Sequence, residues 1–286
     1  MNYFISQPCT RFFGQVCQNC IKLCIDDYSF LFGGQFEAIS PYQNLVRDRG
    51  INWRAVPFPS DVHWNSKMVQ PYPWESDHER LFLVGYGGST ESYSRVVARL
   101  RKQLAGQCDE LPDLCHRSSY GKGRDFVYKA QVNETSIHDI FNSSIFCLNP
   151  PGDLPTRKGL FDSMLMGCIP VTFNPLSATA MYTWHWPEEY WKSVAVEIDE
   201  KTRKSRGFNV VRYLQNISKE EVSSRQKLLR ARAYELQYSY TEPLQHTRPG
   251  RDAFDIAMDE AMSFGAGLSD GVRRASIPPC GFKCNT

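Results

Sequence analysis

The 286-residue chain lacks both glycine-rich signatures of the commonest nucleotide sites. It has no Gly-x-Gly-x-x-Gly, which argues against a dinucleotide cofactor, and no Gly-x-x-x-x-Gly-Lys-Ser/Thr, which argues against a P-loop. A bias of charge is missing as well, because 33 Lys and Arg are mixed with 31 Asp and Glu along the chain. Charge therefore indicates neither nucleic acid nor a membrane surface as a partner.

Long apolar runs are also missing. The sequence contains no run of about 18 apolar residues, so it predicts no transmembrane helix. The opening stretch MNYFISQPCTRFFGQVC lacks the apolar centre and the small-residue cleavage site of a signal peptide. An apolar content of 42% nevertheless permits a substantial core, in one large domain or two medium ones.

Cysteines, by contrast, are plentiful. The ten cysteines lie in local groups: Cys9, Cys17, Cys20 and Cys24; Cys108 and Cys115; Cys147 and Cys168; Cys280 and Cys284. An even number in local groups is typical of disulfides in an oxidising compartment, and we predict bridges within the second and third groups. Two alternatives stay open: buried free thiols, and zinc at Cys17-x-x-Cys20, although no matching second pair of ligands follows.

N-glycosylation sequons favour the same compartment. They occur at Asn133, Asn142 and Asn216. Each sequon is a weak signal alone, but together with the cysteines they favour an oxidising lumen over the cytosol.

Two proline-containing stretches, 56–64 and 70–74, separate the irregular start of the chain from a more regular part. Proline disfavours both helix and sheet there, so a domain boundary is expected in this region. We predict three parts: residues 1–75 as the remnant of an N-terminal domain with a linker, 76–264 as the main domain with a closing helix, and 265–286 as a tail.

From residue 81 onwards, candidate strands alternate with candidate helices, which predicts a parallel sheet covered on both faces. Apolar runs without strict alternation are typical of strands buried on both sides. The expected strands are 81–88, 126–132, 145–148, 168–173 and 193–199, and the expected helices are 92–104, 137–144, 156–166, 219–239 and 252–264.

The segment FCLNPPGDLPTRKGLFDSMLMGCIPVTF, residues 146–173, places a proline-rich loop between a strand and a helix. In parallel sheets, ligands bind in a crevice where the carboxyl ends of strands meet helix N-termini. Gly152 lets the backbone approach a ligand closely. Arg157 and Lys158 stand in the first helical turn, where cations oppose the helix dipole. A bound diphosphate would explain their position.

Other residues of this helix fit the same ligand. Asp153 or Thr156 can cap its N-terminus, and Gly167 can end it. Asp162 can accept hydrogen bonds from ribose hydroxyls, as acids do in nucleotide-binding βαβ units. Since the signatures of dinucleotide and P-loop sites are absent, a nucleotide sugar is the candidate ligand. The alternative is an ordinary capped helix whose basic residues are merely solvated.

The same stretch closely resembles the signature of the exostosin-like glycosyltransferases of family 47. The similarity continues in VPFPSDVH, ERLFLVGYGG, LRKQLAGQC, WPEEYWKSVAVEIDE and RDAFDIAMDEAM, and it covers about residues 56–264. The resemblance implies a GT-B architecture, in which two Rossmann-like domains face each other across a cleft and the second binds a UDP-sugar.

The resemblance also implies the chemistry and the compartment. A sugar is transferred with inversion from a UDP-sugar, which is a substrate, to a polysaccharide or glycoprotein glycan, and no cofactor or metal is required. Family members are usually Golgi membrane proteins with lumenal catalytic domains, and a homo- or heterodimer with another glycosyltransferase is compatible with this. Carried over by position, the donor contacts are Gly152, Thr156, Arg157, Lys158 and Asp162, with Arg101 in addition.

Two features depart from the family pattern. Only residues 1–55 precede the linker stretch, where the family has a full domain and a membrane anchor, so we expect a truncated N-terminal domain and no anchor in this chain. The glycines after Gly85 replace a basic residue that many relatives carry in that loop, which weakens the expected phosphate site.

An inverting transfer needs a base for the acceptor hydroxyl and stabilisation of the leaving UDP. Arg157, Lys158 and the helix N-terminus can serve the second need. The base stays unassigned, because Asp61 and His63 lie in the linker but a lone histidine is more often structural. The main alternative is a non-catalytic partner of an active homologue. A second alternative is a nucleotide-sugar phosphorylase or an epimerase, of which the epimerase would need an NAD fingerprint that the sequence lacks.

Overall fold

The computed structural model describes residues 22–24, 53–65, 71–92, 94–118, 136–152, 155–239 and 250–272. The chain forms two compact units, Met1–Val56 with Phe254–Thr286 and Pro57–Ala253. Within the described ranges, no helix is long and apolar enough to cross a bilayer. The expected strand at 126–132, the sequon at Asn133 and the cysteines at positions 9, 17, 20, 280 and 284 lie outside the described residues.

The first unit contains a short parallel strand pair and a long helix. Strand β1 (Lys22–Cys24) pairs with β2 (Trp53–Ala55), with Lys22 opposite Trp53. Helix α9 (Ala253–Val272) belongs to this unit from Phe254 onwards. This is the helix expected at 252–264, and it continues further along the chain.

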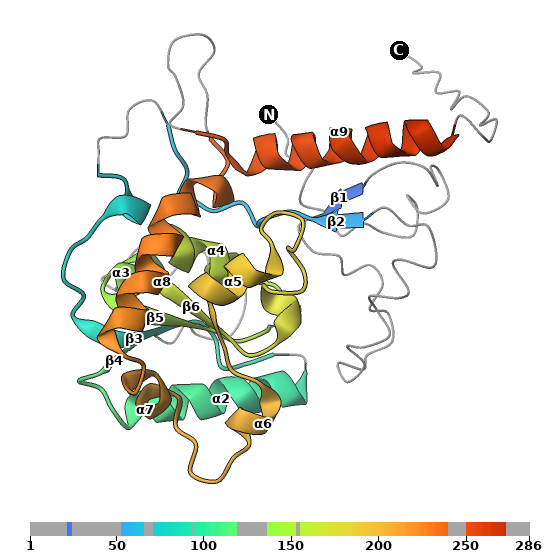
Figure 1. Ribbon diagram of the computed structural model, residues 1–286. Coiled ribbons are helices and arrows are strands. Elements are labelled where there is room, and N and C mark those ends of the chain that lie inside the picture. Colours follow the sequence, from blue (N-terminus) through green and yellow to red (C-terminus); the bar gives the residue numbers. More distant parts are fainter. Residues whose placement is uncertain are drawn as a thin grey trace, which may run out of the picture. The chain divides into compact units, whose positions relative to one another are not determined.

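The second unit contains a five-stranded parallel sheet with the order β4-β3-β5-β6-β7 (Figure 1). The strands are β3 (Phe82–Gly87), β4 (Cys115–Ser118), β5 (Ser144–Asn149), β6 (Ile169–Thr172) and β7 (Val196–Glu197). The chain places β4 on one side of β3 and then β5 on the other, so the strand order reverses between β3 and β5. In open parallel sheets the ligand crevice lies at such a switch point, beyond the carboxyl ends of the strands.

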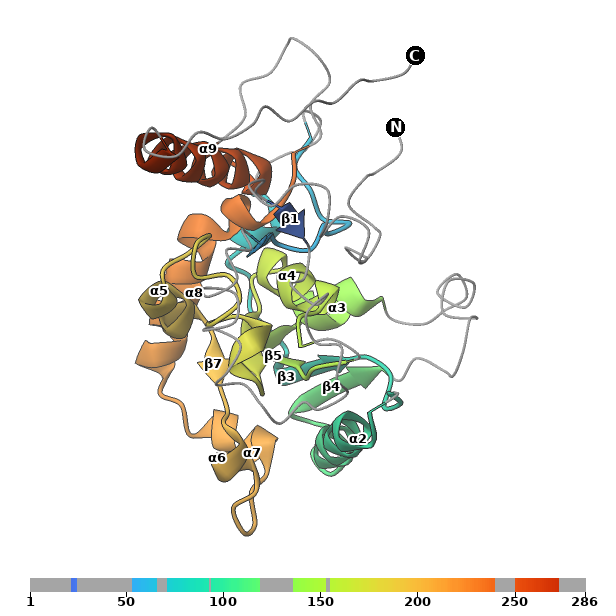
Figure 2. The same cartoon turned by 90° about the vertical axis from the view of Figure 1, so that its right-hand side faces the viewer.

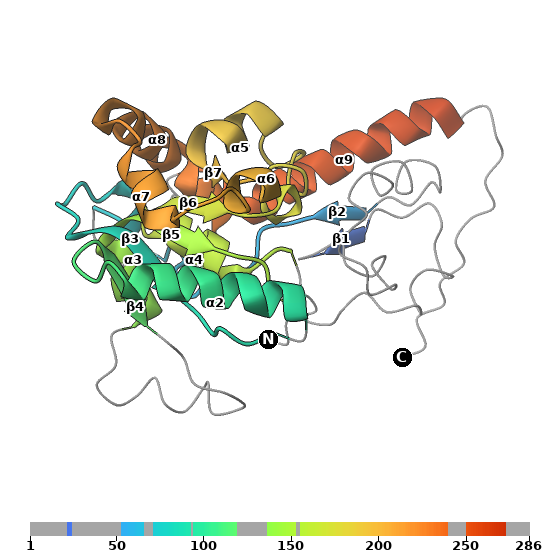
Figure 3. The ribbon, with the colours of Figure 1, turned by 90° about the horizontal axis from the view of Figure 1, so that it is seen from below.

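Helices cover both faces of this sheet, as the alternation of elements predicted. Figures 1 and 2 show α2 and α7 below the strands and α3 and α4 above them, and Figure 3 shows α2 running along the sheet. The principal helices are α2 (Arg95–Asp109), α3 (Ile137–Asn142), α4 (Lys158–Leu165), α5 (Glu188–Val194), α6 (Glu200–Arg203), α7 (Val210–Gln215) and α8 (Lys219–Arg232). Short 3-10 turns lie at Pro73–Glu75, Pro175–Ser177 and Ala233–Leu236.

The central strands are buried on both faces, which explains their unbroken apolar runs. Phe146, Ile169 and Val171 are fully buried, and together they form a core with the apolar face of α2. Glycines on β3 let α3 approach closely. A Cβ atom on Gly87 would lie 2.7 Å from Cγ1 of Ile137 on α3, so a larger residue there would push α3 away from the sheet.

Both predicted disulfides are confirmed. The Cα atoms of Cys108 and Cys115 are 5.2 Å apart, and those of Cys147 and Cys168 are 5.9 Å apart. The first bridge connects the end of α2 to the start of β4. The second connects β5 to the residue before β6, the two strands that enclose the proline-rich loop. For these four cysteines, the free-thiol alternative is wrong.

Some expected boundaries differ from the structure. Helix α4 starts at Lys158 rather than at residue 156, and β7 is shorter than the expected strand 193–199 because α5 continues to Val194. Strand β4 was not predicted, since CHRS is short and its last three residues are only half-buried at the sheet edge. A short polar edge strand carries almost no periodic signal.

The second unit also starts earlier than the sequence suggested. It begins at Pro57 rather than near residue 76, because the proline-containing stretch packs onto the end of the domain. The Tyr238 hydroxyl donates to the Pro57 carbonyl at 2.7 Å, and the Trp64 amide donates to Gln237 Oε1 at 2.8 Å. The supposed linker is therefore part of the folded unit.

A structural arginine secures the amino ends of the strands. Arg80 Nη1 donates to the carbonyls of Phe141, Asn142 and Ser144 at 2.9–3.0 Å, and Nη2 donates to that of Met166 at 2.8 Å. These carbonyls lie at the C-terminal ends of α3 and α4 and at the start of β5. One cation thus satisfies several helix-end acceptors, a favourable position for positive charge.

Candidate functional site

Two loops meet at the switch point between β3 and β5. The buried side chain of Arg101 on α2 joins them: Nη1 donates to the Ser89 carbonyl at 2.6 Å, and Nε donates to the Pro151 carbonyl at 2.8 Å. An arginine carries five N–H groups, so these two bonds leave donors for a further acceptor. Arg101 therefore both shapes the crevice and can contribute charge to it.

Arg157 lies against the same proline-rich loop. A Cβ atom on Gly152 would lie 2.1 Å from Arg157 Nη1 and 2.4 Å from its Cζ, so a larger residue here would push this guanidinium aside. Pro151 bonds to Arg101, and Gly152 follows it directly. Two guanidinium groups thus approach one dipeptide from two different helices. Such a pair is favoured by an anion placed between the two groups.

The N-terminus of α4 points into this region without a cap from its own N-cap residue. Arg157 occupies the N-cap position, and its side chain makes no capping hydrogen bond. The expected cap by Thr156 is wrong: its side chain is 1% exposed, and within the described residues its Oγ1 has no hydrogen-bond partner. Asp153, the other expected cap, lies outside the described residues. A helix N-terminus without a side-chain cap from its N-cap residue, beside the unpartnered Thr156 hydroxyl, suits a phosphate.

Lys158 and Asp162 do not face this crevice as expected. Lys158 Nζ bonds to Asp162 Oδ2 at 2.8 Å and to Asp61 Oδ2 at 2.9 Å, and Ser60 Oγ donates to Asp162 Oδ1 at 2.5 Å. The Asp162 side chain is only 4% exposed. Its oxygens hold the segment before β3 onto α4, so this geometry does not favour the predicted ribose contact.

The charges in this ion-pair cluster stabilise one another. A hydrogen bond from Lys158 lowers the pKa of Asp61. Burial alone would lower the pKa of Lys158, but the attraction of Asp162 and the hydrogen bonds to both carboxylates outweigh it and raise that pKa. The lowered pKa and the pairing with Lys158 make Asp61 a poor general base.

Two matched variants distinguish the exposed and the buried carboxylate of the cluster. Asp61→Asn should lower the free energy of unfolding by at most about 1 kcal/mol, since its side chain is largely exposed and screened. Asp162→Asn should lower it by roughly 2 kcal/mol, because a buried carboxylate loses charge-assisted bonds. Urea denaturation at pH 7 measures both. Equal effects would contradict the difference in burial.

The pH dependence gives a further check on the Asp61 variant. The folded-state pKa of Asp61 lies below its unfolded value of about 3.9, so its contribution is complete above that value. The contribution is lost as the pH falls through the folded-state pKa. The wild type and Asp61→Asn should therefore differ at pH 7 and converge at acidic pH, below the folded-state pKa.

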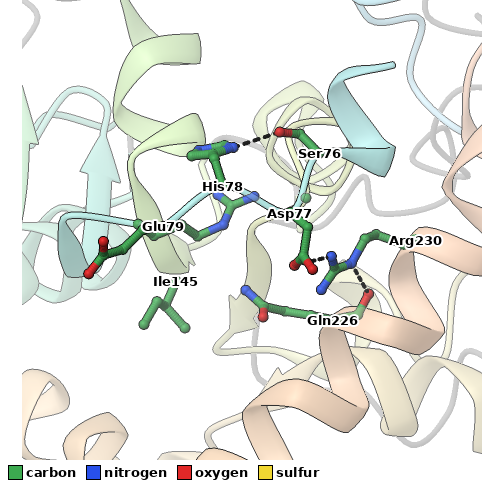
Figure 4. Close-up of a pocket in the computed structure, with 9 residues that line it drawn as sticks. Ser76, Asp77, His78, Glu79, Ile145, Gln226 and Arg230 are labelled. Atoms are coloured by element: carbon green, nitrogen blue, oxygen red, sulfur yellow. Dashed lines mark hydrogen bonds and ion pairs between the residues drawn. The ribbon is translucent and has the colours of Figure 1, made fainter. Parts of the chain in front are cut away.

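A cavity of 280 Å³ lies at the opposite end of the strands, beside Arg80, Ile145 and Gly167. The two arginines that line it are already engaged, as Figure 4 shows for Arg230, which lies between Asp77 and the Gln226 backbone. This cavity opens at the amino ends of β3, β5 and β6. Its cations are occupied by protein acceptors, so it does not compete with the crevice as an anion site.

The predicted site residues thus fall into two groups. Arg101, Gly152 and Arg157 come together at the switch point, with Thr156 buried next to Arg157 in the chain, whereas Lys158 and Asp162 join Ser60 and Asp61 in the ion-pair cluster. Ser60 was missed, because nothing in the sequence connects it with a carboxylate 102 positions away. The sequon residues Asn142 and Asn216 are exposed, which leaves the prediction of glycosylation open.

Comparison with known proteins adds family membership to this geometry. The family model "Exostosin GT47 domain" matches residues 44–214. The xyloglucan galactosyltransferase MUR3 of Arabidopsis thaliana is 32% identical over 210 residues, which cover 71% of this chain and 32% of that protein. The probable xyloglucan galactosyltransferase GT20 of the same plant is 39% identical over 248 residues, covering 80% and 40%.

A third relative in Arabidopsis thaliana, xyloglucan-specific galacturonosyltransferase 1, is 31% identical over 227 residues, covering 73% of this chain and 30% of that protein. This chain spans about a third of the length of the first two curated relatives it matches. Among solved structures, the GtfA/B complex aligns over 82% of this chain and 44% of that chain, with 10% identity and a TM-score of 0.35. On the strength of the matched domain, the chain belongs to the exostosin GT47 family.

Proposed function

We propose that the protein is an inverting glycosyltransferase that uses a UDP-sugar as donor and a polysaccharide as acceptor. One observation carries the proposal: Arg101 and Arg157 flank the Pro151-Gly152 dipeptide at the switch point of the sheet, beside the uncapped N-terminus of α4. This arrangement provides positive charge and N–H donors where parallel sheets bind nucleotides. The family membership supports the same reading.

The geometry suits stabilisation of a leaving nucleotide. In the transfer, the acceptor oxygen bonds to the anomeric carbon, the bond from that carbon to the UDP oxygen breaks, and the acceptor proton passes to a base. Negative charge develops on the phosphate, and preorganised cations and N–H groups placed there lower the barrier. Attack from the face opposite UDP inverts the anomeric carbon. The base remains unassigned, because Asp61 is paired with Lys158.

The names of the relatives suggest the first substrates to test. They are described as xyloglucan galactosyl- or galacturonosyltransferases. We therefore propose UDP-galactose and UDP-galacturonic acid as donors and xyloglucan as acceptor. A Golgi lumenal location is part of this proposal, and the two disulfides support it because such bonds persist in oxidising compartments.

The experiment is a transfer assay with the full chain. Incubation with UDP-galactose and xyloglucan should release UDP and add galactosyl residues, and NMR of the product should show the β-anomer from the α-linked donor. The rate should be the same with EDTA present, since a metal is not expected to be required. A product that retains the α-configuration would contradict inversion, and loss of activity with EDTA would contradict metal independence.

A non-catalytic partner role is the second candidate. The ion-pair cluster favours this role. Asp61 and Asp162 both pair with Lys158, so neither of these two carboxylates is placed to accept a proton from an acceptor hydroxyl. This role predicts binding of UDP without turnover of any UDP-sugar. UDP binding with no turnover alone, but with accelerated turnover by an added active homologue, would favour it over the enzyme.

A further inference from the structure

We infer that the Tyr86 hydroxyl is an additional binding group for the phosphates of the donor, an inference that rests on the proposed function. Tyr86 is the penultimate residue of β3, next to the switch point. Nothing in the composition or the motifs of the sequence distinguishes it from an ordinary strand aromatic. Its surroundings in the folded unit distinguish it from an ordinary strand aromatic.

The hydroxyl of Tyr86 is buried and unsatisfied. The residue is 1% exposed, and within the described part of the chain its Oη has no hydrogen-bond partner. Buried hydroxyl groups in proteins are nearly always hydrogen-bonded, because leaving one unpaired costs stability. A phenylalanine would fill the same apolar space without that cost. The orphan hydroxyl therefore requires an explanation beyond packing.

The ring lies beside the arginine that joins the two loops. A Cβ atom on Gly88 would lie 4.0 Å from Tyr86 Cε2 and 4.0 Å from Arg101 Nη1, so both groups border the same glycine. Arg101 bonds to carbonyls at Ser89 and Pro151. Tyr86 thus adjoins the part of the crevice where Arg101 has N–H groups to spare.

The electrostatic environment identifies the kind of partner. Burial raises the pKa of Tyr86, so the hydroxyl stays protonated at neutral pH and remains a hydrogen-bond donor. Arg101, Arg117 and Arg157 act in the opposite direction, which shows that their charge favours a negative group near Oη. Of the three, Arg101 has the largest effect, and Arg117 is bound to Asp109 through both carboxylate oxygens. A phosphate oxygen is the acceptor that matches this field.

Two tyrosine-to-phenylalanine variants test the inference. In Tyr86→Phe, UDP affinity should fall about tenfold, as expected for a hydrogen bond to a charged group, and resistance to urea should be unchanged or increased. Tyr190→Phe is the matched control, because the Tyr190 hydroxyl donates to the Leu228 carbonyl at 2.7 Å. That control should lose stability and keep its UDP affinity. Calorimetric titration with UDP and denaturation in urea give both quantities.

Titrations with two ligands, UDP and inorganic pyrophosphate, separate recognition of the phosphates from recognition of the nucleoside. The Tyr86→Phe loss should be present with UDP and with inorganic pyrophosphate. Unchanged affinity of Tyr86→Phe for UDP, with Arg157→Ala weakened, would overturn the role of Tyr86 and leave the donor site standing. A loss with UDP but not with pyrophosphate would place the hydroxyl on the nucleoside and overturn the phosphate assignment. No binding of UDP by the wild type would overturn the proposed function itself.

Discussion

Replacement of Arg157 by alanine should weaken UDP binding about ten- to hundredfold, the equivalent of one charge-assisted hydrogen bond worth roughly 1.5–3 kcal/mol. The guanidinium lies against Gly152 at the N-terminus of α4, where a phosphate would be bound by backbone N–H groups as well. The remaining groups of the crevice would stay in place. The variant should therefore bind UDP weakly rather than not at all.

The stability of Arg157→Ala should change little, because the side chain is only half-buried. Arg206→Ala is a suitable control, since Arg206 is an exposed arginine in the turn after α6. Calorimetric titration at low and moderate salt measures the UDP affinity of the wild type, Arg157→Ala and Arg206→Ala. If Arg157→Ala and Arg206→Ala bound UDP as tightly as the wild type, the loop would not be the donor site.

Loss of the Cys147–Cys168 bridge should lower the free energy of unfolding by roughly 3 kcal/mol, from the chain entropy of the loop that it closes. The two cysteines are 21 positions apart and fully buried. The closed loop contains the proline-rich loop and α4, so the bridge holds the strands on either side of the candidate site. The double variant Cys147→Ala/Cys168→Ala, unfolded in urea, measures the effect.

The other bridge provides the comparison. Cys108 and Cys115 are 7 positions apart, and the same relation gives roughly 2.5 kcal/mol for the shorter loop. Cys108→Ala/Cys115→Ala should thus destabilise the protein less, and its UDP affinity should be unchanged, because this bridge joins α2 to an edge strand. A larger loss of stability in this variant than in the first would contradict the loop-length argument.

Local features of the sequence predicted much of the fold correctly. The unbroken apolar runs correctly predicted strands β5 and β6, and the helical periodicity after residue 92 correctly predicted helix α2. The paired cysteines correctly predicted the two disulfide bridges. These features depend on neighbouring residues, and so they can be read from a single chain. Strand β4 was missed, because an edge strand of four residues is defined by its pairing with β3 rather than by its own pattern.

The candidate site was predictable only in part. The proline-rich loop and Arg157 were found because a glycine, a helix start and basic residues follow one another in the sequence. The pairing of Asp162 with Ser60 was not predicted, because it depends on a contact between residues 102 positions apart. That contact gives the Asp162 carboxylate a structural partner, and the ribose contact stays a prediction. Tyr86 was missed for the same reason: its unsatisfied hydroxyl is a property of the packed unit.

The central claim is that the diphosphate of a UDP donor binds at the carboxyl ends of β3 and β5. A crystal structure of the full chain with UDP would test this most directly. The account predicts phosphate oxygens within hydrogen-bond distance of the Arg157 guanidinium, Thr156 Oγ1 and the first amides of α4. UDP bound at the amino ends of the strands, beside Arg80 and Arg230, would contradict it.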